Sequence, residues 1–236
     1  ETEFSSYGVT RPLLDELISL LDSHYFLAND RFFAAQEKLK IDFLNAPVRP
    51  AALAGATYPQ SPAQLRTEID GYLREEQPIV QKDERTHGAL AVLVAPHIDY
   101  RRGGSCYGAA YRELRSDSSD VYIAIGTSHQ YSSLLFHLTK KDFVTPMGVL
   151  PCDHGFVEKL AQRYGYQRSF ADELLHRREH SLELQLPFLS RLKPSASIVP
   201  ILVGGFHSML ASGNEPPAVP EYDQFVAALS ETIADT

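Results

Sequence analysis

The chain has 236 residues, of which 44% are hydrophobic and 22% charged, and this profile is typical of a globular protein with a sizeable core. Its formal net charge of −8 argues against nucleic acid or an anionic membrane as the main partner, because most of the surface would repel a polyanion. The sequence contains no apolar run near the roughly 20 residues that cross a bilayer. Its two cysteines do not make a disulfide framework, so we expect a cytoplasmic protein.

The first part of the chain predicts two amphipathic helices. Residues 12–26 carry five leucines on one helical stripe, and residues 30–44 begin at an aspartate that is suited to cap a second helix. Residues 45–62 hold four prolines and no helical period, which indicates a connection. A third helix is predicted over residues 61–76, where a serine cap precedes a proline in the first turn.

From residue 89 onward, short apolar runs alternate with helical patterns. The expected strands span residues 89–95, 121–126, 134–138 and 197–204, and the expected helices span 105–114, 154–165 and 181–192. Runs rich in Val, Ile and Leu are typical of strands that are buried on both faces. The pattern predicts an α/β fold with a central sheet, largely parallel or mixed, and helices on both of its faces.

Two histidines follow consecutive predicted strands. His97 comes directly after the strand expected at 89–95, and His129 after the strand expected at 121–126. Ligands of open α/β sheets bind in the crevice beyond the carboxyl ends of the strands. A lone loop histidine is more often an ordinary surface residue, but the matched placement of two favours a pair of metal ligands at one edge of the sheet.

A third group of histidines lies in the segment HRREHSLE. His176, Glu179 and His180 spell H-x-x-E-H, the signature of inverted zinc peptidases, which requires both histidines on one helix. Ser181, however, is a good N-cap, so we expect His180 to stand at the entrance of a helix that begins after it. A histidine at that place can face a cleft, where Glu179 or Glu183 would orient it.

The glycines after His97 suggest an anion site. Gly103 and Gly104 precede a predicted helix, and together with Arg101 they are candidates for binding a carboxylate or phosphate. A tight turn with close packing explains the same glycines equally well. Asp99 is a candidate metal ligand, a partner of a ligand, or a solvated loop acid. His207, which follows the last predicted strand, is a reserve candidate for the site.

Five segments in order resemble the Memo family. They are VLVAPHIDYRRGGSCYGAAYREL, IAIGTSHQ, FVTPMGVLPCD, EHSLELQLPFL and IVPILVGG, and the resemblance covers about residues 50–205. It implies the fold of class III extradiol dioxygenases, which open catechol rings with a non-haem Fe(II). It further implies that His97 and His129 are metal ligands and that His180 is the acid/base residue.

The sequence also departs from the family pattern. Ile98 and Asp99 replace the usual Ala-Gly, so Asp99 is a candidate for completing a set of two histidines and a carboxylate. His176, Arg177 and Arg178 replace acidic residues, which favours an anionic ligand. The family's later S-D-x-x-H segment, which supplies a further ligand, does not occur before Thr236.

These observations lead to two hypotheses. The first is a metal-dependent, dioxygenase-like oxidoreductase acting on a small anionic substrate, with iron as the expected metal and copper or zinc as alternatives. The second is a non-catalytic module that binds a small molecule or a peptide on the same fold, and a metallopeptidase is a distant third. Asp99, His176 and Glu183 are the candidates for an additional ligand or a supporting contact. We expect residues 1–49 to form a helical extension and residues 50–236 a Memo-like domain that lacks the C-terminal segment of its family.

Overall fold

The computed structural model describes residues 10–75, 90–206, 213 and 219–236. The chain divides into two compact units, one ending at Asn45 and one beginning at Ala46. Among the described residues, no helix has the length and apolarity that a membrane span requires.

The described residues of the first unit form α1 (Arg11–Ser23), as the leucine spacing predicts, and α2 (Asp30–Asn45), which was also predicted. The Thr10 side chain caps α1 by accepting a hydrogen bond from the Leu13 N–H. At the start of α2 the side chain of Asn29 accepts from the Phe32 N–H at 3.1 Å, so Asn29 takes the capping role that the sequence suggested for Asp30.

The described residues of the second unit form two three-stranded sheets. One has the order β2 (Val121–Thr127), β6 (Ser197–Val203), β3 (Phe136–Leu138), in which β2 is parallel and β3 antiparallel to β6. The other has the order β1 (Val48–Arg49), β4 (Asp142–Thr145), β5 (Gly148–Leu150). The predicted α/β class with mixed strand directions is confirmed, although the strands form two small sheets instead of one central sheet.

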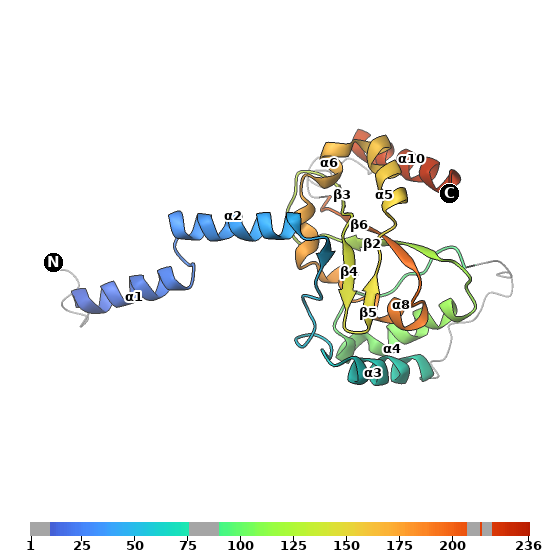
Figure 1. Cartoon of the computed structure of the whole chain (residues 1–236), viewed down its shortest axis with the longest axis horizontal. Helices are drawn as coiled ribbons and strands as arrows, with labels where there is room; N and C mark the ends of the chain where they lie inside the picture. Colours follow the sequence, from blue (N-terminus) through green and yellow to red (C-terminus); the bar gives the residue numbers. More distant parts are fainter. Residues whose placement is uncertain (1–9, 76–89, 207–212, 214–218) are drawn as a thin grey trace. The chain divides into compact units, whose positions relative to one another are not determined.

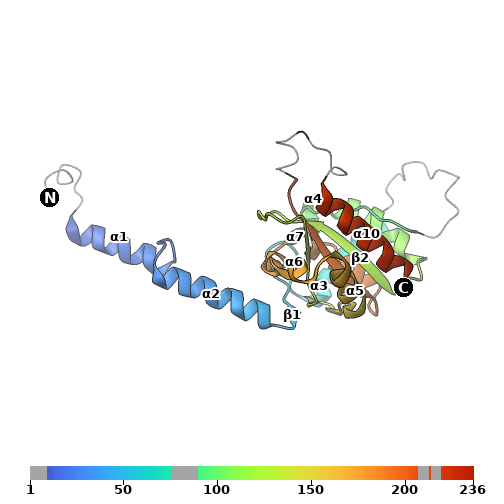
Figure 2. The same ribbon diagram turned by 90° about the horizontal axis from the view of Figure 1, so that it is seen from above.

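Helices pack on both sides of these strands. They are α3 (Pro62–Arg74), α4 (Tyr100–Tyr111), α5 (His154–Tyr164), α6 (Tyr166–Phe170), α7 (His180–Glu183), α8 (Leu186–Leu192) and α10 (Pro220–Ala234), with 3-10 turns at Arg112–Arg115 and Glu173–Arg177. In Figure 1, α3, α4 and α8 gather on one side of the strands, and α5, α6 and α10 gather on the other. Figure 2 shows α10 running alongside β2.

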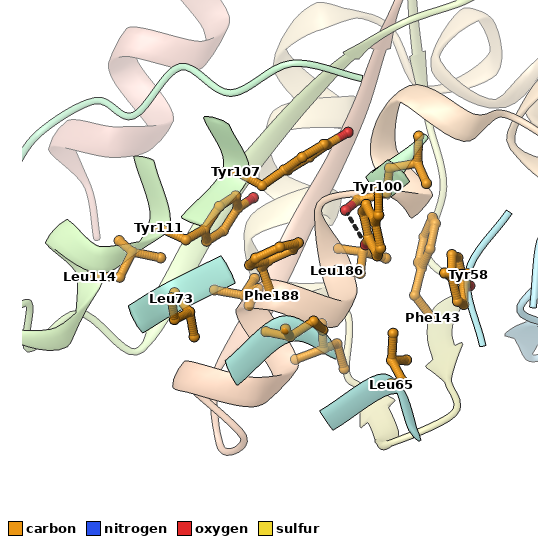
Figure 3. Close-up of a cluster of buried hydrophobic side chains, with 14 of the residues drawn as sticks. Tyr58, Leu65, Leu73, Tyr100, Tyr107, Tyr111, Leu114, Phe143, Leu186 and Phe188 are labelled. Atoms are coloured by element: carbon orange, nitrogen blue, oxygen red, sulfur yellow. Dashed lines mark hydrogen bonds between the residues drawn. The ribbon is translucent and has the colours of Figure 1, made fainter. Parts of the chain in front are cut away.

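Aromatic side chains dominate the core between α3, α4 and α8 (Figure 3). The ring of Phe188 lies 5.2 Å from the ring centroids of both Tyr100 and Tyr107. The buried hydroxyl of Tyr100 donates a hydrogen bond to the Leu184 carbonyl at 2.6 Å. Because both tyrosines belong to α4, this core fixes the start of the helix that follows His97.

The strand expected at 89–95 does not form. Residues 90–96 have no strand pairing, and Val92 and Val94 are 76% and 86% exposed, although the sequence predicted burial. Neither sheet of the described residues includes residues 90–96, so the backbone of this run pairs with no strand. An apolar run becomes a strand only where a partner satisfies its backbone, which the local sequence cannot reveal.

Two helix boundaries also differ from the prediction. The helix expected at 105–114 begins five residues earlier, at Tyr100, because Asp99 caps it. The helix expected at 181–192 is split into α7 and α8, and α7 begins at His180 with Glu179 as its cap instead of Ser181. Pro187 stands in the first turn of α8, where its missing N–H interrupts a continuous helix.

Candidate metal centre

Three histidines from three separate segments come together at one end of β2. One possible ligand nitrogen from each of His97, His129 and His180 lies within 4.8 Å of the other two. Their ring centroids are 5.2 Å apart for His97 and His129, 5.6 Å for His97 and His180, and 4.2 Å for His129 and His180. Within the described part of the chain, this is the one group of three or more such side chains compact enough to hold a metal ion.

Hydrogen bonds to the flanking backbone position His97. The Gln185 side-chain amide donates to the Pro96 carbonyl at 2.9 Å, and the Tyr107 hydroxyl donates to the Ile98 carbonyl at 3.1 Å. Gln185 in turn accepts a hydrogen bond from the Tyr111 hydroxyl at 3.0 Å. The sequence predicted that a strand of the sheet would position His97. In the structure, side-chain hydrogen bonds to the residues before and after His97 position it instead.

Close packing of α7 on β2 brings His180 to His129. The Ser181 hydroxyl donates to the Thr127 carbonyl at 2.8 Å, at the last residue of the strand. A side chain at Gly126 would collide with α7, because a Cβ there would lie 2.6 Å from the Ser181 hydroxyl oxygen. This contact holds the entrance of α7 against the strand end, where His129 follows.

Glu179 is the central supporting residue of the cluster. Its carboxylate accepts hydrogen bonds from the His129 N–H and the Ser181 N–H, each at 2.9 Å, and lies 2.9 Å from the His129 Nδ1 atom. Burial by itself raises the pKa of Glu179, but these hydrogen bonds outweigh it and hold the pKa below its usual value. A carboxylate can only accept, so Nδ1 of His129 is the donor in this contact, and Nε2 is the ring atom that could bind a metal.

The surroundings of His180 favour its neutral form. Burial lowers its pKa, and the neighbouring His129 and His97 lower it further, whereas Glu179 opposes the shift. The Nδ1 atom of His180 lies 3.3 Å from the Glu179 carboxylate. A neutral imidazole is the form that binds a metal or accepts a proton near neutral pH.

Asp99 does not join the histidine cluster. Its side chain accepts a hydrogen bond from the Arg102 N–H at 3.2 Å and pairs with the Arg102 guanidinium at 2.5 Å, so it caps α4. These contacts with Arg102 lower the pKa of Asp99. The set of two histidines and a carboxylate that the sequence suggested is therefore not assembled by Asp99.

His176 and Glu183, the other candidate ligands, are buried elsewhere. His176 is 1% exposed and its Nε2 atom lies 3.1 Å from the His137 carbonyl, which rules out the peptidase pairing of His176 with His180. Glu183 is 2% exposed, forms an ion pair with Arg49 at 2.5 Å, and accepts from the Tyr58 hydroxyl at 2.6 Å. Neither side chain belongs to the histidine cluster as a ligand, because each points toward a partner far away in the sequence.

Arg49 forms hydrogen bonds with the backbone of the segment 176–179, which leads into α7. Its guanidinium is fully buried and donates to the carbonyls of His176 and Glu179, at 2.7 and 3.0 Å. Together with the ion pair to Glu183, these bonds fix the backbone that leads into α7. No sequence pattern indicates this role, since a lone arginine in a proline-rich connection usually lies on the surface.

Neighbouring side chains fill the space beside the glycines where an anion site was predicted. Gly103 and Gly104 are buried inside α4, and a Cβ at Gly104 would lie 2.2 Å from the ring of Tyr72. The Gly103 N–H donates to the Asp99 carbonyl at 2.9 Å, which leaves it unavailable to a ligand. Arg101 lines a separate hollow together with Ala56 and Thr57.

Basic side chains do border the histidines from another direction. A cavity of about 750 Å³ is lined by His97 and His180 together with other polar and apolar side chains. The charged ones are Asp99, Arg102 and Arg178, and the apolar ones include Leu53, Ile98 and Leu184. Within the described ranges no carboxylate pairs with Arg178, whereas Arg102 is held by Asp99. His207, the reserve candidate, lies outside the described residues.

An α/β domain that gathers three histidines at a strand end defines a candidate metal-binding protein. A family model described as Memo-like protein matches residues 49–212, and the chain belongs to this Memo-like family. It is 30% identical to a MEMO1 family protein of Aquifex aeolicus over 80% of this chain and 48% of that protein. It is 29% identical to a MEMO1 family protein of Thermus thermophilus, over 86% of this chain and 60% of that protein.

A vertebrate relative is similar to the same degree. The chain is 29% identical to Protein MEMO1 of Danio rerio over 66% of this chain and 51% of that protein. The chain thus spans about half the length of most of the curated relatives it matches.

Proposed function

We propose that the domain binds a divalent first-row metal, iron in the first place, and that His97 and His129 are its ligands. The observation that carries this proposal is the approach of three histidine nitrogens to within 4.8 Å of one another. Imidazole donors suit iron, copper and zinc alike, so the donor set fits the metal that the family resemblance implies. Glu179 adds the carboxylate support that metal-bound histidines usually have.

We propose further that the metal serves a dioxygenase-like oxidoreductase. When bound, iron would supply Lewis acidity and electron transfer to the site. His180, neutral at physiological pH and in contact with the rings of His97 and His129, is the residue we assign to proton transfer.

The cavity beside the cluster supports a small anionic substrate. Arg178 offers a guanidinium to a carboxylate or phosphate, and the apolar walls at Leu53 and Leu184 suit a ring or short aliphatic group. Asp99 neutralises Arg102, which leaves Arg178 as the main anchor for negative charge in this cavity.

One observation favours the alternative, a non-catalytic binding module. The side chains of His129 and His180 are 43% and 38% exposed, whereas oxygen chemistry is usually enclosed from water. A module of this kind would bind a small molecule or a peptide at the same cavity without turning it over.

Metal analysis after anaerobic loading with iron tests the first step of the proposal. We expect metal in the wild type and in a His154→Ala control, whose exposed histidine lies on α5, and a large loss in His97→Ala and His129→Ala. Equal metal content in all four proteins would overturn the assignment. His180→Ala should keep most of the metal if this residue transfers protons.

Oxygen uptake by the iron-loaded protein then separates the two functions. We expect uptake with carboxylated catechols, slower uptake with uncharged catechols, and little in His180→Ala. Tight binding of the same compounds without oxygen uptake would favour the binding module.

A further inference from the structure

A second hollow adjoins the cavity that is lined by His97 and His180, which we call the histidine cavity. The second hollow has a volume of about 490 Å³, and we call it the distal hollow, because none of the described histidines lines it. Its lining consists of Ala56, Thr57, Asp99, Arg101 and Arg102. Thr57, Asp99 and Arg102 also line the histidine cavity, so these three side chains form the boundary between the two spaces.

Arg101 is the uncompensated positive charge of the distal hollow. Its exposed side chain has no ion pair within the described part of the chain. Arg102, by contrast, pairs with Asp99 at 2.5 Å, so the charges of these two groups offset each other. On a chain with a formal net charge of −8, an unpaired arginine in a hollow is a place where an anion is attracted locally.

A single free guanidinium suits a carboxylate better than a phosphate. A guanidinium binds a carboxylate through two parallel hydrogen bonds, and the Thr57 hydroxyl in the same lining is a further possible donor. A phosphate group carries up to about two negative charges and would require a second free cation. Because Asp99 already neutralises Arg102, the distal hollow offers the charge for one carboxylate.

The boundary between the two spaces indicates the form of the ligand. Their volumes of about 750 and 490 Å³ both fall in the range of roughly 300–1,000 Å³ that is usual for small-molecule pockets. A ring with one acidic group would use the histidine cavity alone, where Arg178 is the free cation. A ligand that also uses the distal hollow needs a chain that passes Thr57 and carries a second acidic group.

We propose that the distal hollow is a second carboxylate site, so that the substrate is an elongated molecule with an acidic group at each end. One acidic group binds Arg178 in the histidine cavity. The other stands at the end of a short aliphatic chain and binds Arg101. This inference rests on the proposed function, because it names the class of substrate that the same site takes.

Anaerobic calorimetry with three matched ligands tests the proposal. The first ligand is a catechol with a ring carboxylate, the second adds a short aliphatic chain that ends in a carboxylate, and the third has the same chain ending in a carboxamide. We expect the wild type to bind the second about tenfold more tightly than the third, as for a hydrogen bond to a charged group. Arg101→Gln should abolish this preference and leave the affinity for the first ligand unchanged.

Arg66→Gln is the matched control, because Arg66 is an exposed arginine of α3 that lines neither space. It removes the same charge and should keep the wild-type preference for the carboxylate. Loss of the preference in Arg66→Gln as well would reveal a general charge effect and overturn the site at Arg101. Circular dichroism checks that both variants are folded.

Arg178→Gln separates a failure of this inference from a failure of the proposed function. It should weaken all three ligands about tenfold, since each carries the ring carboxylate. If it does so but the chain carboxylate brings no gain over the carboxamide, or the gain survives in Arg101→Gln, the distal site is refuted and the proposed anionic substrate stands. The substrate with two acidic ends is also overturned if Arg178→Gln changes no affinity. If none of the three ligands binds the wild type, the proposed substrate fails and the distal site falls with it.

Discussion

The two sides of the histidine cluster are held by different kinds of structure. On the side of His129 and His180, a buried network of Arg49, Glu179 and Glu183 fixes the backbone with charge-assisted hydrogen bonds. On the side of His97, the preceding segment has no strand partner among the described residues, and two neutral hydrogen bonds hold the position. The side of His129 and His180 is therefore the rigid half of the site, fixed by buried charged groups, whereas the side of His97 depends on neutral hydrogen bonds.

The largest expected effect comes from breaking the rigid half. Arg49→Met leaves Glu183 buried without its cation, and we expect the free energy of unfolding to fall by about 3–5 kcal/mol. Urea denaturation measures the change. Arg49→Met combined with Glu183→Gln should be less destabilised than Arg49→Met alone, and a cost below about 1 kcal/mol for the single variant would refute the role of the network.

A smaller effect is expected on the side of His97. Gln185→Leu removes the donor to the Pro96 carbonyl and the acceptor of the Tyr111 hydroxyl, and we expect a loss of about 1–3 kcal/mol in unfolding free energy. Hydrogen exchange around His97 should quicken while exchange in α7 stays slow. The exposed Gln162→Leu on α5 serves as the control, with an expected change within about 0.5 kcal/mol.

Acid should weaken the rigid half through His176. Burial, aided by the charge of Arg49, lowers the pKa of His176 to about 3, whereas an unfolded chain has a histidine pKa near 6.5. As pH falls below about 6.5 the unfolded state gains a proton that the folded state rejects, so stability drops by up to about 1.4 kcal/mol per pH unit. Urea midpoints between neutral and mildly acid pH should fall less steeply in His176→Gln.

His154→Gln is the control for this pH series, since His154 is an exposed residue in the first turn of α5. It should retain the wild-type slope. His137 is also buried with a lowered pKa, so some pH dependence should persist in His176→Gln. Identical slopes in the wild type and His176→Gln would contradict the prediction.

The smallest effect on stability is expected in the lining of the cavity beside the histidines. Arg178→Ala should change the unfolding free energy by no more than about 0.5 kcal/mol, because its exposed side chain has no ion-pair partner within the described part of the chain. Binding of a carboxylated catechol, measured by calorimetry, should weaken about tenfold, as expected for the loss of a charged hydrogen bond. Arg66→Ala, on α3, should bind normally, and equal affinity in all three proteins would remove Arg178 from the site.

The sequence by itself determined the α/β class, most helices and the neighbourhood of His97 and His129. Helix caps such as Ser61 and Asp153 act within three residues, and β2 and β6 are apolar enough to be recognised alone. These features depend on local contacts or on periodicity. Short stretches of the sequence are therefore enough to predict these helices and strands.

The tertiary structure decided which polar side chains meet. Glu179 supports His129 across 50 positions, and Arg49 reaches the carbonyls of His176 and Glu179 across 127 and 130 positions. His176 and His180 share one motif, yet one is buried against a distant carbonyl and the other enters the cluster. Residues 90–95 have the composition of a strand, but the partner that would make them one is not encoded next to them. Directions of side chains and pairing of edges are set by distant neighbours, which only the folded chain brings together.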